Sequence, residues 1–350
     1  MNNKKLLKAA RNLLLDCAGL RRSDSLLIVR ENEKLGWYKN DISDFILRSA
    51  NDIGIDAFLH EVGPPEISQD ENFYKKMNQY SCVIFFARLG DQNRFENNGF
   101  STKRVMSYVR DCESLASTFG TLDYNLNILI KDAIDRLIET SNKIEINCPL
   151  GTNLIGKISK DNCETKEVSV LRFPVLVSKP IGAKPFAGKV VLNNYLTSTG
   201  SRVYTPNFLR IDNEVTITID NGSITDVQGI PEDVKNFRKH YDYVSKEFGI
   251  DMNSVHSWHP GIHPGTSDNK FYKYDPDKWS NTVFGKPKYL HFHTCGNYAP
   301  GEICLMIPNH TVLIDDKPLW KDGELLLNGF EHTKGLLEKH ATLKNVFSGN

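Results

Sequence analysis

The first 140 residues alternate short apolar segments with amphipathic ones, and this pattern constrains the fold more than any other feature of the sequence. Residues 25–29 and 82–87 are largely apolar runs, residues 56–62 are strand-like, and residues 41–51 carry apolar side chains at helical spacing. Buried strands separated by helices are typical of βαβ units, which form a parallel sheet. We therefore predict an α/β domain in the N-terminal half.

The pattern changes after residue 141, where a second domain is predicted to begin. Residues 143–147 alternate apolar and polar side chains, and Asp220-Asn221-Gly222 separates two strand-like runs. Asn-Gly supplies the positive φ angles of a type I′ hairpin turn. One long helix is predicted over residues 232–248. The predicted architecture is thus an α/β domain over residues 1–141 and an α+β, mainly antiparallel domain over residues 142–350.

The charge balance and short motifs exclude several classes of function. The chain has 43 basic and 43 acidic residues, so nothing in its charge favours nucleic acid or an anionic membrane as a partner. It contains no GxGxxG after the first predicted strand and no GxxxxGK[ST] sequence, so no nucleotide site is supported. We expect a small molecule to be the substrate.

The cysteines and the N-terminus favour a cytoplasmic protein. Seven cysteines form no CxxC pair, which is typical of free thiols in a reducing compartment. The first 20 residues have apolar side chains on one helical face, with charged residues between them, and lack the unbroken apolar run of a signal peptide. No segment approaches the roughly 20 apolar residues that span a bilayer.

Histidines concentrate in residues 255–310, and this window is where we expect the functional site. Six of the ten histidines lie there, whereas an even distribution would place fewer than two. Histidine is the commonest metal ligand and titrates nearest to neutral pH. Residues 256–263 contain Pro and Gly and are predicted to form a loop. The six are His256, His259, His263, His291, His293 and His310.

The sequence Tyr-Leu-His-Phe-His predicts two imidazoles on one face of a strand, since side chains two residues apart point the same way. Glu302 follows within a dozen residues. We predict a metal site formed by His256, His291 and Glu302, with Fe(II) as first choice and zinc as second. His259, His263 and His293 are predicted as alternative ligands or proton carriers. His310 is assigned to a turn, and buried structural histidines and cysteines remain the simpler alternative.

The order of several motifs resembles the aminopeptidase T family (also labelled leucyl aminopeptidase) and its relative 2,5-dihydroxypyridine 5,6-dioxygenase. The resemblance covers about residues 145–325. Its motifs are CPLGTNL at 148–154, RFP at 172–174, IDNGSI at 219–224, GIHP at 261–264, Leu290-His291 with Gly296, and VLID at 312–315 before Gly323. It implies an aminopeptidase T-like fold and suggests that the chain could be a homodimer.

The resemblance also implies metal ligands, but most of the positions differ here. The peptidases hold two metal ions with carboxylates and histidines, and the dioxygenases hold one iron with two histidines and a carboxylate. The family's Gly-Glu falls near Leu176 and Val177, which cannot bind a metal ion. The glutamate before its Asn-Pro motif falls near His256 and Ser257, and the Asn itself is His263. The histidine of its His-x-Ala-x-Gly motif is similar to His291, and its His-x-Asp pair falls on Glu302 and Cys304.

Three hypotheses follow. The first is a mononuclear non-haem iron oxygenase that acts on a small molecule, for which an aromatic compound is one option. The second is a zinc-dependent hydrolase similar to an aminopeptidase, in which zinc generates the hydroxide. The third is a metal-free binding protein, or an enzyme that uses His291 or Cys304 directly. Metal content and the requirement for oxygen distinguish them.

Overall fold

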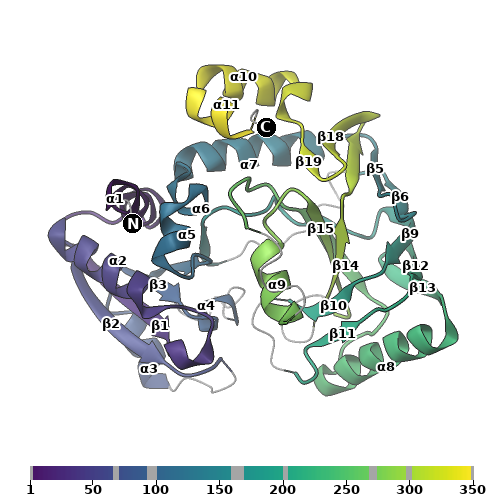
Figure 1. Ribbon diagram of the computed structural model, residues 1–350, viewed down its shortest axis with the longest axis horizontal. Helices are drawn as coiled ribbons and strands as arrows, with labels where there is room; N and C mark the ends of the chain where they lie inside the picture. Colours follow the sequence, from purple (N-terminus) through teal and green to yellow (C-terminus); the bar gives the residue numbers. More distant parts are fainter. Residues whose placement is uncertain are drawn as a thin grey trace. The chain divides into compact units, whose positions relative to one another are not determined.

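The structure, a computed structural model, describes residues 3–65, 71–92, 101–158, 169–199, 204–267, 274–296 and 302–347 (Figure 1). The chain forms two compact units. Unit 1 comprises Met1–Ile128 and Lys166–Val175, and unit 2 comprises Leu129–Thr165 and Leu176–Asn350. Each unit is described by itself.

Unit 1 contains a parallel sheet of five strands, in agreement with the predicted α/β domain. The strand order is β2-β1-β3-β4-β7, and every pairing in it is parallel. All five residues of β3 are buried, as expected for a strand covered on both faces. The strands are β1 (Ser25–Glu31), β2 (Asp56–Val62), β3 (Cys82–Phe86), β4 (Lys103–Ser107) and β7 (Leu171–Phe173).

The longer helices of unit 1 are amphipathic, and the first follows the predicted pattern. Helix α1 (Asn3–Arg11) buries Leu6, Ala9 and Ala10 and continues as a π-helix over Asn12–Cys17. The others are α2 (Asn40–Asp52), α3 (Glu71–Met77), α4 (Leu89–Gln92), α5 (Cys112–Ala116) and α6 (Thr118–Thr121). Helix α7 (Tyr124–Glu139) contains the junction between the two units, after Ile128.

The fifth strand of this sheet comes from beyond the predicted boundary at residue 141. Strand β7 lies some thirty residues past that boundary, yet it pairs with β4 through Val105–Leu171, Met106–Arg172 and Ser107–Phe173. A return of the chain to the first sheet is a long-range event that no local pattern announces. The two units of the structure are therefore discontinuous in sequence, whereas the two predicted domains are not.

Unit 2 contains two sheets whose pairings are antiparallel, which agrees with the predicted α+β domain. The first has the order β11-β10-β16-β15-β14-β8, and the second β13-β12-β9-β6-β5-β17-β18-β19 (Figure 1). The predicted hairpin joins β12 to β13, with φ of 48° at Asn221 and 73° at Gly222. The long helix is α8 (Pro231–Phe248), as predicted.

The other elements of unit 2 are short. The strands are β5 (Ile144–Asn147), β6 (Asn153–Gly156), β8 (Ile181–Gly182), β9 (Phe186–Leu192), β10 (Tyr195–Ser198), β11 (Phe208–Arg210), β12 (Val215–Asp220), β13 (Ser223–Gln228), β14 (Val255–Pro260), β15 (Tyr289–Thr294), β16 (Ile303–Pro308), β17 (Thr311–Ile314), β18 (Lys317–Lys321) and β19 (Glu324–Leu325). The helices are α9 (Pro276–Val283), α10 (Glu331–Lys339) and α11 (Ala341–Phe347).

Trp258 and Phe292 lie in the core between the two sheets of unit 2. They are cross-strand partners on β14 and β15, and both are fully buried. The indole of Trp258 packs edge-on against Phe186 of β9 in the other sheet, with 5.2 Å between ring centroids. Because side chains alternate along a strand, these apolar anchors turn His259, His291 and His293 to the opposite face of β14 and β15.

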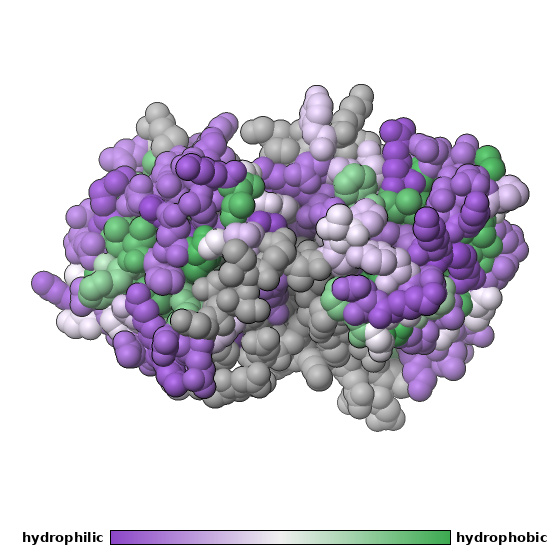
Figure 2. All heavy atoms as spheres, turned by 90° about the horizontal axis from the view of Figure 1, so that it is seen from below, coloured by the Kyte–Doolittle hydropathy of each residue, from purple (hydrophilic) through white to green (hydrophobic). Residues whose placement is uncertain are grey.

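The described helices include none that is long and apolar enough to cross a membrane. On the face shown in Figure 2, hydrophilic side chains predominate, and hydrophobic ones form separate small groups between them. The six described cysteines form no disulfide, and Cys163 lies outside the described residues.

His310 lies in the predicted turn, between β16 and β17, but its side chain is buried. Asn309 before it has φ of 53°, and the imidazole lies 6.2 Å from the ring centroid of Trp320. Burial disfavours the charged imidazolium and lowers the pKa of His310 to about 3, although a contact with the backbone of Lys288 opposes this shift. The folded protein therefore holds this histidine neutral at acidic pH.

We expect His310→Leu to reduce the sensitivity of the fold to acid. In the unfolded chain His310 takes up a proton near pH 6.5, whereas the folded chain delays this uptake to about pH 3. Between these values the unfolded chain binds one more proton than the folded chain. This group therefore lowers the free energy of unfolding by about 1.4 kcal/mol for each unit by which the pH falls. Urea unfolding at pH 6, 5 and 4 should show a shallower slope for the variant. Equal slopes would contradict the prediction.

Candidate metal centre

Three histidines lie together on one face of the six-stranded sheet. His291 and His293 alternate with the buried Phe292 on β15, and His259 of β14 is the cross-strand partner of His291. The loop predicted over residues 256–263 is wrong for its first part, because residues 256–260 belong to the strand β14, which pairs with β15 up to Pro260. This pairing, rather than loop geometry, joins the histidines.

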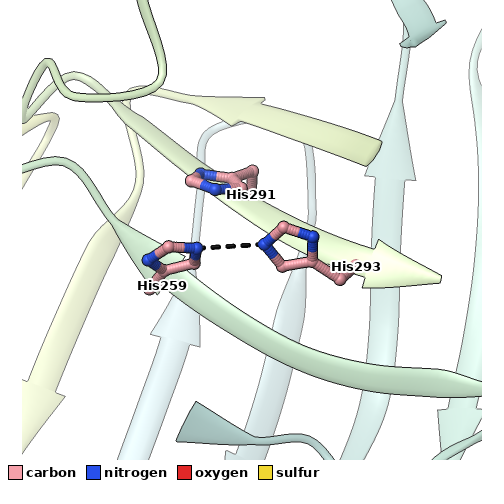
Figure 3. Close-up of side chains that lie close together, drawn as sticks. All are labelled: His259, His291 and His293. Carbon is pink, nitrogen blue, oxygen red and sulfur yellow. Dashed lines mark hydrogen bonds between the residues drawn. The ribbon is translucent and has the colours of Figure 1, made fainter. Parts of the chain in front are cut away.

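The three imidazoles face one another (Figure 3). Nε2 of His259 lies 3.0 Å from Nε2 of His293, and the ring centroids of His259 and His291 are 4.1 Å apart. One nitrogen from each ring lies within 4.8 Å of the other two. In the part of the chain that the structure describes, this is the one group of three or more potential ligands that could hold a metal ion.

The hydrogen bonds of His259 define which nitrogen can bind a metal ion. Its Nδ1 lies 3.3 Å from the carbonyl oxygen of Ser178, which can only accept a hydrogen bond. Nδ1 therefore carries the proton, and the lone pair of Nε2 accepts a 3.0 Å hydrogen bond from Nε2 of His293. A histidine that donates one ring N–H to a carbonyl and offers the other nitrogen is the usual arrangement of a metal ligand.

A carboxylate lies on the outer side of His293. Nδ1 of His293 is 3.7 Å from Oε1 of Glu302, and both side chains are largely buried. The hydroxyl of Thr199 donates to Oε2 of Glu302 at 2.5 Å, and the hydroxyl of Tyr204 donates to the Glu302 carbonyl at 3.1 Å. Glu302 thus faces the nitrogen of His293 that points away from the cluster.

Apolar side chains adjoin the cluster on the side of helix α9. The Phe284 ring lies edge-on to His291, with 6.0 Å between centroids. Phe284 packs in turn on a buried cluster formed by Tyr195, Trp279, Val283, Tyr289, Cys304 and Met306. Thr197 on β10 and Ser280 on α9 share a hydrogen bond of 2.8 Å, which ties the helix to the sheet. The histidine cluster therefore has an apolar flank on one side.

Two of the three donors have the spacing that a single divalent ion needs. Two nitrogens that each lie about 2.1 Å from one ion, at nearly a right angle, are about 3.0 Å apart. Nε2 of His259 and Nε2 of His293, which share a hydrogen bond in the structure, are 3.0 Å apart, so an ion that replaces the shared proton needs little movement of these two rings. Three neutral imidazoles would leave further coordination positions open, and such positions are what catalytic metal sites provide for water or substrate.

Of the three ligands predicted from the sequence, the structure brings His291 into the cluster and places Glu302 next to it. His256 is the extra residue of a β-bulge between Val255 and Ser257, and its Nδ1 lies 2.9 Å from the hydroxyl of Ser257. Burial lowers the pKa of His256, and the negative charge of Glu302 opposes this shift. His256 is not one of the three clustered histidines.

The three histidines predicted as alternative ligands or proton carriers do not all lie together. His259 and His293 belong to the cluster, but His263 lies in the loop after β14. The backbone N–H of Gly265 donates to Nδ1 of His263, and burial lowers the pKa of His263 to about 3. A neutral buried imidazole of this kind is a poor proton carrier near pH 7.

The cysteines near the site are not activated nucleophiles. Burial raises the pKa of Cys304 and of Cys295 to about 12, so both remain thiols near neutral pH. Cys304 is the cross-strand partner of His293, but it is also part of the apolar cluster under α9. Its position explains the high pKa.

The sequence analysis gave His259 only as an alternative ligand and did not place it opposite His291. The sequence offered one indication, because Trp258 is next to His259 and Phe292 lies between His291 and His293. If both aromatic side chains point into the core from adjacent strands, the three histidines point to the opposite face of the sheet. That inference required the assumption that residues 256–260 form a strand.

Comparisons with known proteins show the fold. No family model matches the sequence, and no curated protein sequence matches it. Among solved structures, 2,5-dihydroxypyridine dioxygenase from Pseudomonas putida KT2440 is similar, with 13% identity, 95% of this chain and 99% of that chain covered, and a TM-score of 0.65. AmpT from Thermus thermophilus is similar with 11% identity, 93% and 100% coverage, and a TM-score of 0.55. The predicted resemblance is thus confirmed for the fold.

Proposed function

We propose that this chain is a metal-dependent enzyme in which His259, His291 and His293 bind one divalent ion. The observation that carries the proposal is the convergence of three nitrogens within 4.8 Å of one another on a single sheet face. This ligand set differs from the one read from the sequence, because His259 and His293 replace His256 and Glu302. Both similar structures carry the names of enzymes, a dioxygenase and an aminopeptidase, which supports an enzymatic role.

We propose Fe(II) as the ion and oxygenation of a small molecule as the reaction. Two observations favour this version. The described residues contain one group of potential ligands, whereas a two-metal hydrolase needs a second group and a bridging carboxylate. The dioxygenase fold matches this chain over 95% of its length. Iron held by imidazoles with open positions supplies the one-electron chemistry that lets O2 react with a bound substrate.

The residues of the chain have separate tasks in this proposal. His259 and His293 offer Nε2 to the ion, and Ser178 and Glu302 contact the opposite nitrogens of their rings. Phe284 and the apolar cluster behind it exclude water on one side of His291 and offer a flat ring surface. Such a flank suits an aromatic or otherwise flat substrate, since aromatic rings pack edge-on or offset against each other.

A zinc hydrolase is the second candidate, and the donor set supports it. Three neutral histidines are a known ligand set for catalytic zinc, which lowers the pKa of bound water and generates hydroxide near neutral pH. The similar structure AmpT supports this version through its fold. The metal-free alternative with Cys304 as nucleophile has less support, because burial holds that thiol protonated.

Metal analysis and oxygen dependence test the proposal. We expect protein purified without chelators under anaerobic conditions to hold one iron ion per chain, measured by mass spectrometry. With a panel of dihydroxylated aromatic compounds, including 2,5-dihydroxypyridine, we expect substrate turnover that consumes O2 and that stops when oxygen is removed. Turnover of aminoacyl amides without oxygen, by protein that holds zinc, would support the hydrolase instead. Protein that binds neither iron, zinc nor manganese would contradict both versions.

We further propose a cytoplasmic enzyme with a small-molecule substrate and no nucleic-acid or membrane partner. The free described cysteines and the balanced charge support this setting. A homodimer is the assembly that the resemblance suggests. Size-exclusion chromatography with light scattering would test it.

A further inference from the structure

We infer that Glu302 is a positioning residue whose buried carboxylate, held by Thr199, sets the ring orientation and the tautomer in which His293 offers Nε2 to the ion. The inference rests on the proposed function, because it takes His293 as a metal ligand. It assigns Glu302 a role outside the coordination sphere, in contrast to its prediction as a ligand from the sequence.

The position of Glu302 is defined from several sides. Its side chain is buried, one carboxylate oxygen accepts the Thr199 hydroxyl, and its backbone carbonyl accepts the Tyr204 hydroxyl. The other carboxylate oxygen lies 3.7 Å from Nδ1 of His293. Thr199 directly follows strand β10, and Glu302 directly precedes strand β16. Because Ser198 of β10 pairs with Ile303 of β16, the sheet brings the two residues together.

The contact between Glu302 and His293 is electrostatic, because 3.7 Å is too long for a hydrogen bond. A negative charge next to Nδ1 favours the tautomer with the proton on that nitrogen. In the structure Nε2 of His259 accepts the 3.0 Å hydrogen bond between the two rings, so Nε2 of His293 carries the proton there. An ion must displace that proton, and the charge of Glu302 favours its move to Nδ1, which leaves the lone pair of Nε2 to the ion. Without the charge, the proton stays on Nε2 more strongly and competes with the ion.

The two clustered histidines with known outer contacts differ in the charge of those contacts. His259 donates to the neutral carbonyl of Ser178, whereas His293 faces a carboxylate. All three proposed ligands are neutral, so Glu302 is the nearby group whose negative charge can offset the charge of a divalent ion. Outer carboxylates of this kind orient ligating histidines and raise their basicity, and their loss typically weakens metal binding about 10–100-fold.

Cobalt binding to the full-length protein tests the inference, with Co2+ alone as the probe. Affinity is measured by competition with a chelator, and geometry by the visible absorption bands of bound cobalt. We expect Glu302→Gln to retain one cobalt site per chain, with affinity about 10–100-fold lower and shifted bands. Thr199→Val should lower the cobalt affinity and shift the absorption bands in the same direction, but by a smaller factor. This variant keeps the negative charge of Glu302 and removes only the hydrogen bond that holds its carboxylate.

Asp277→Asn provides a matched control. Asp277 is a buried carboxylate on α9 that accepts a hydrogen bond from Ser198, the neighbour of Thr199, but it is not next to the clustered histidines in sequence or pairing. We expect its cobalt affinity and absorption bands to match those of the wild-type protein. Circular dichroism of the metal-free proteins checks folding, and if Glu302→Gln does not fold, Thr199→Val decides.

The possible outcomes separate this inference from the proposed function. If the wild-type protein binds no cobalt, iron or zinc, the proposed function fails, and the inference fails with it. If the wild-type protein binds cobalt and Glu302→Gln has the same affinity and spectrum, the inference alone is overturned. If Glu302→Gln abolishes binding as fully as loss of a clustered histidine, Glu302 is a ligand and not a positioning residue.

Discussion

We expect His291→Ala to abolish stoichiometric metal binding and the activity proposed to depend on it. His291 contributes one of three converging nitrogens, and its loss leaves two imidazoles on the same face. We expect affinity for Co2+ or Fe2+ to fall on the order of 10³-fold, because several kcal/mol of binding are lost and each 1.4 kcal/mol corresponds to a factor of ten. Chelator competition and metal analysis of the purified variant measure the effect. His259→Ala and His293→Ala should behave alike.

His256→Ala is the matched control for this set. His256 lies on the same strand as His259, but the β-bulge separates it from the cluster, and its ring contacts Ser257. We expect this variant to keep its metal ion and to bind it with an affinity within a few-fold of the wild-type value. If His256→Ala loses metal as His291→Ala does, the ligand set proposed here is wrong and the one read from the sequence is favoured.

We expect unit 2 of the Trp258→Ala variant to have a much lower free energy of unfolding than unit 2 of the wild-type protein. The indole is fully buried between the two sheets and packs against Phe186 and Phe292. Truncation of a buried tryptophan leaves a large cavity and typically costs about 3–5 kcal/mol. Metal affinity should fall as well, because Trp258 adjoins His259 and holds its strand against the core. Urea unfolding of the metal-free protein, followed by circular dichroism, measures the loss of stability.

Two further variants make this prediction specific. Trp258→Phe keeps most of the apolar volume and removes an indole N–H that has no hydrogen-bond partner among the described residues. We therefore expect it to cost much less than Trp258→Ala. Ile155→Ala serves as the control, because Ile155 lies in the other sheet of unit 2 but is 47% exposed. It should change the free energy of unfolding by no more than about 0.5 kcal/mol. Equal losses for Trp258→Ala and Ile155→Ala would contradict the packing described here.

Much of the fold follows from local patterns. The apolar runs that become β1 and β3 are too short for helices and too apolar for edge strands, which favours a parallel sheet with helices on both faces. Asn221 and Gly222 adopt the positive φ angles that a two-residue hairpin requires. These outcomes depend on chain neighbours within a few residues, which is why the sequence predicts them.

The candidate site was predictable in part. The spacing of His291 and His293 places them on one face of any strand, and the apolar residues around them indicate a buried strand. The position of His256 was not predictable, because a β-bulge adds one residue to β14 and interrupts its pairing there. The position of Glu302 next to His293 was not predictable either, since the distance between them depends on how β16 pairs with β15.

The sequence by itself determined the strands β1 and β3, the β12–β13 hairpin, helix α8, the class of each sheet and the pair of histidines on β15, because strand and helix periods act over a few residues. The tertiary structure alone decided that β7 returns to the first sheet and that His259 lies opposite His291. It also decided that Glu302 faces the outer nitrogen of His293. Each of these depends on the register between strands far apart in the chain. That register is set by burial of side chains such as Trp258 and Phe292, and no local pattern encodes it.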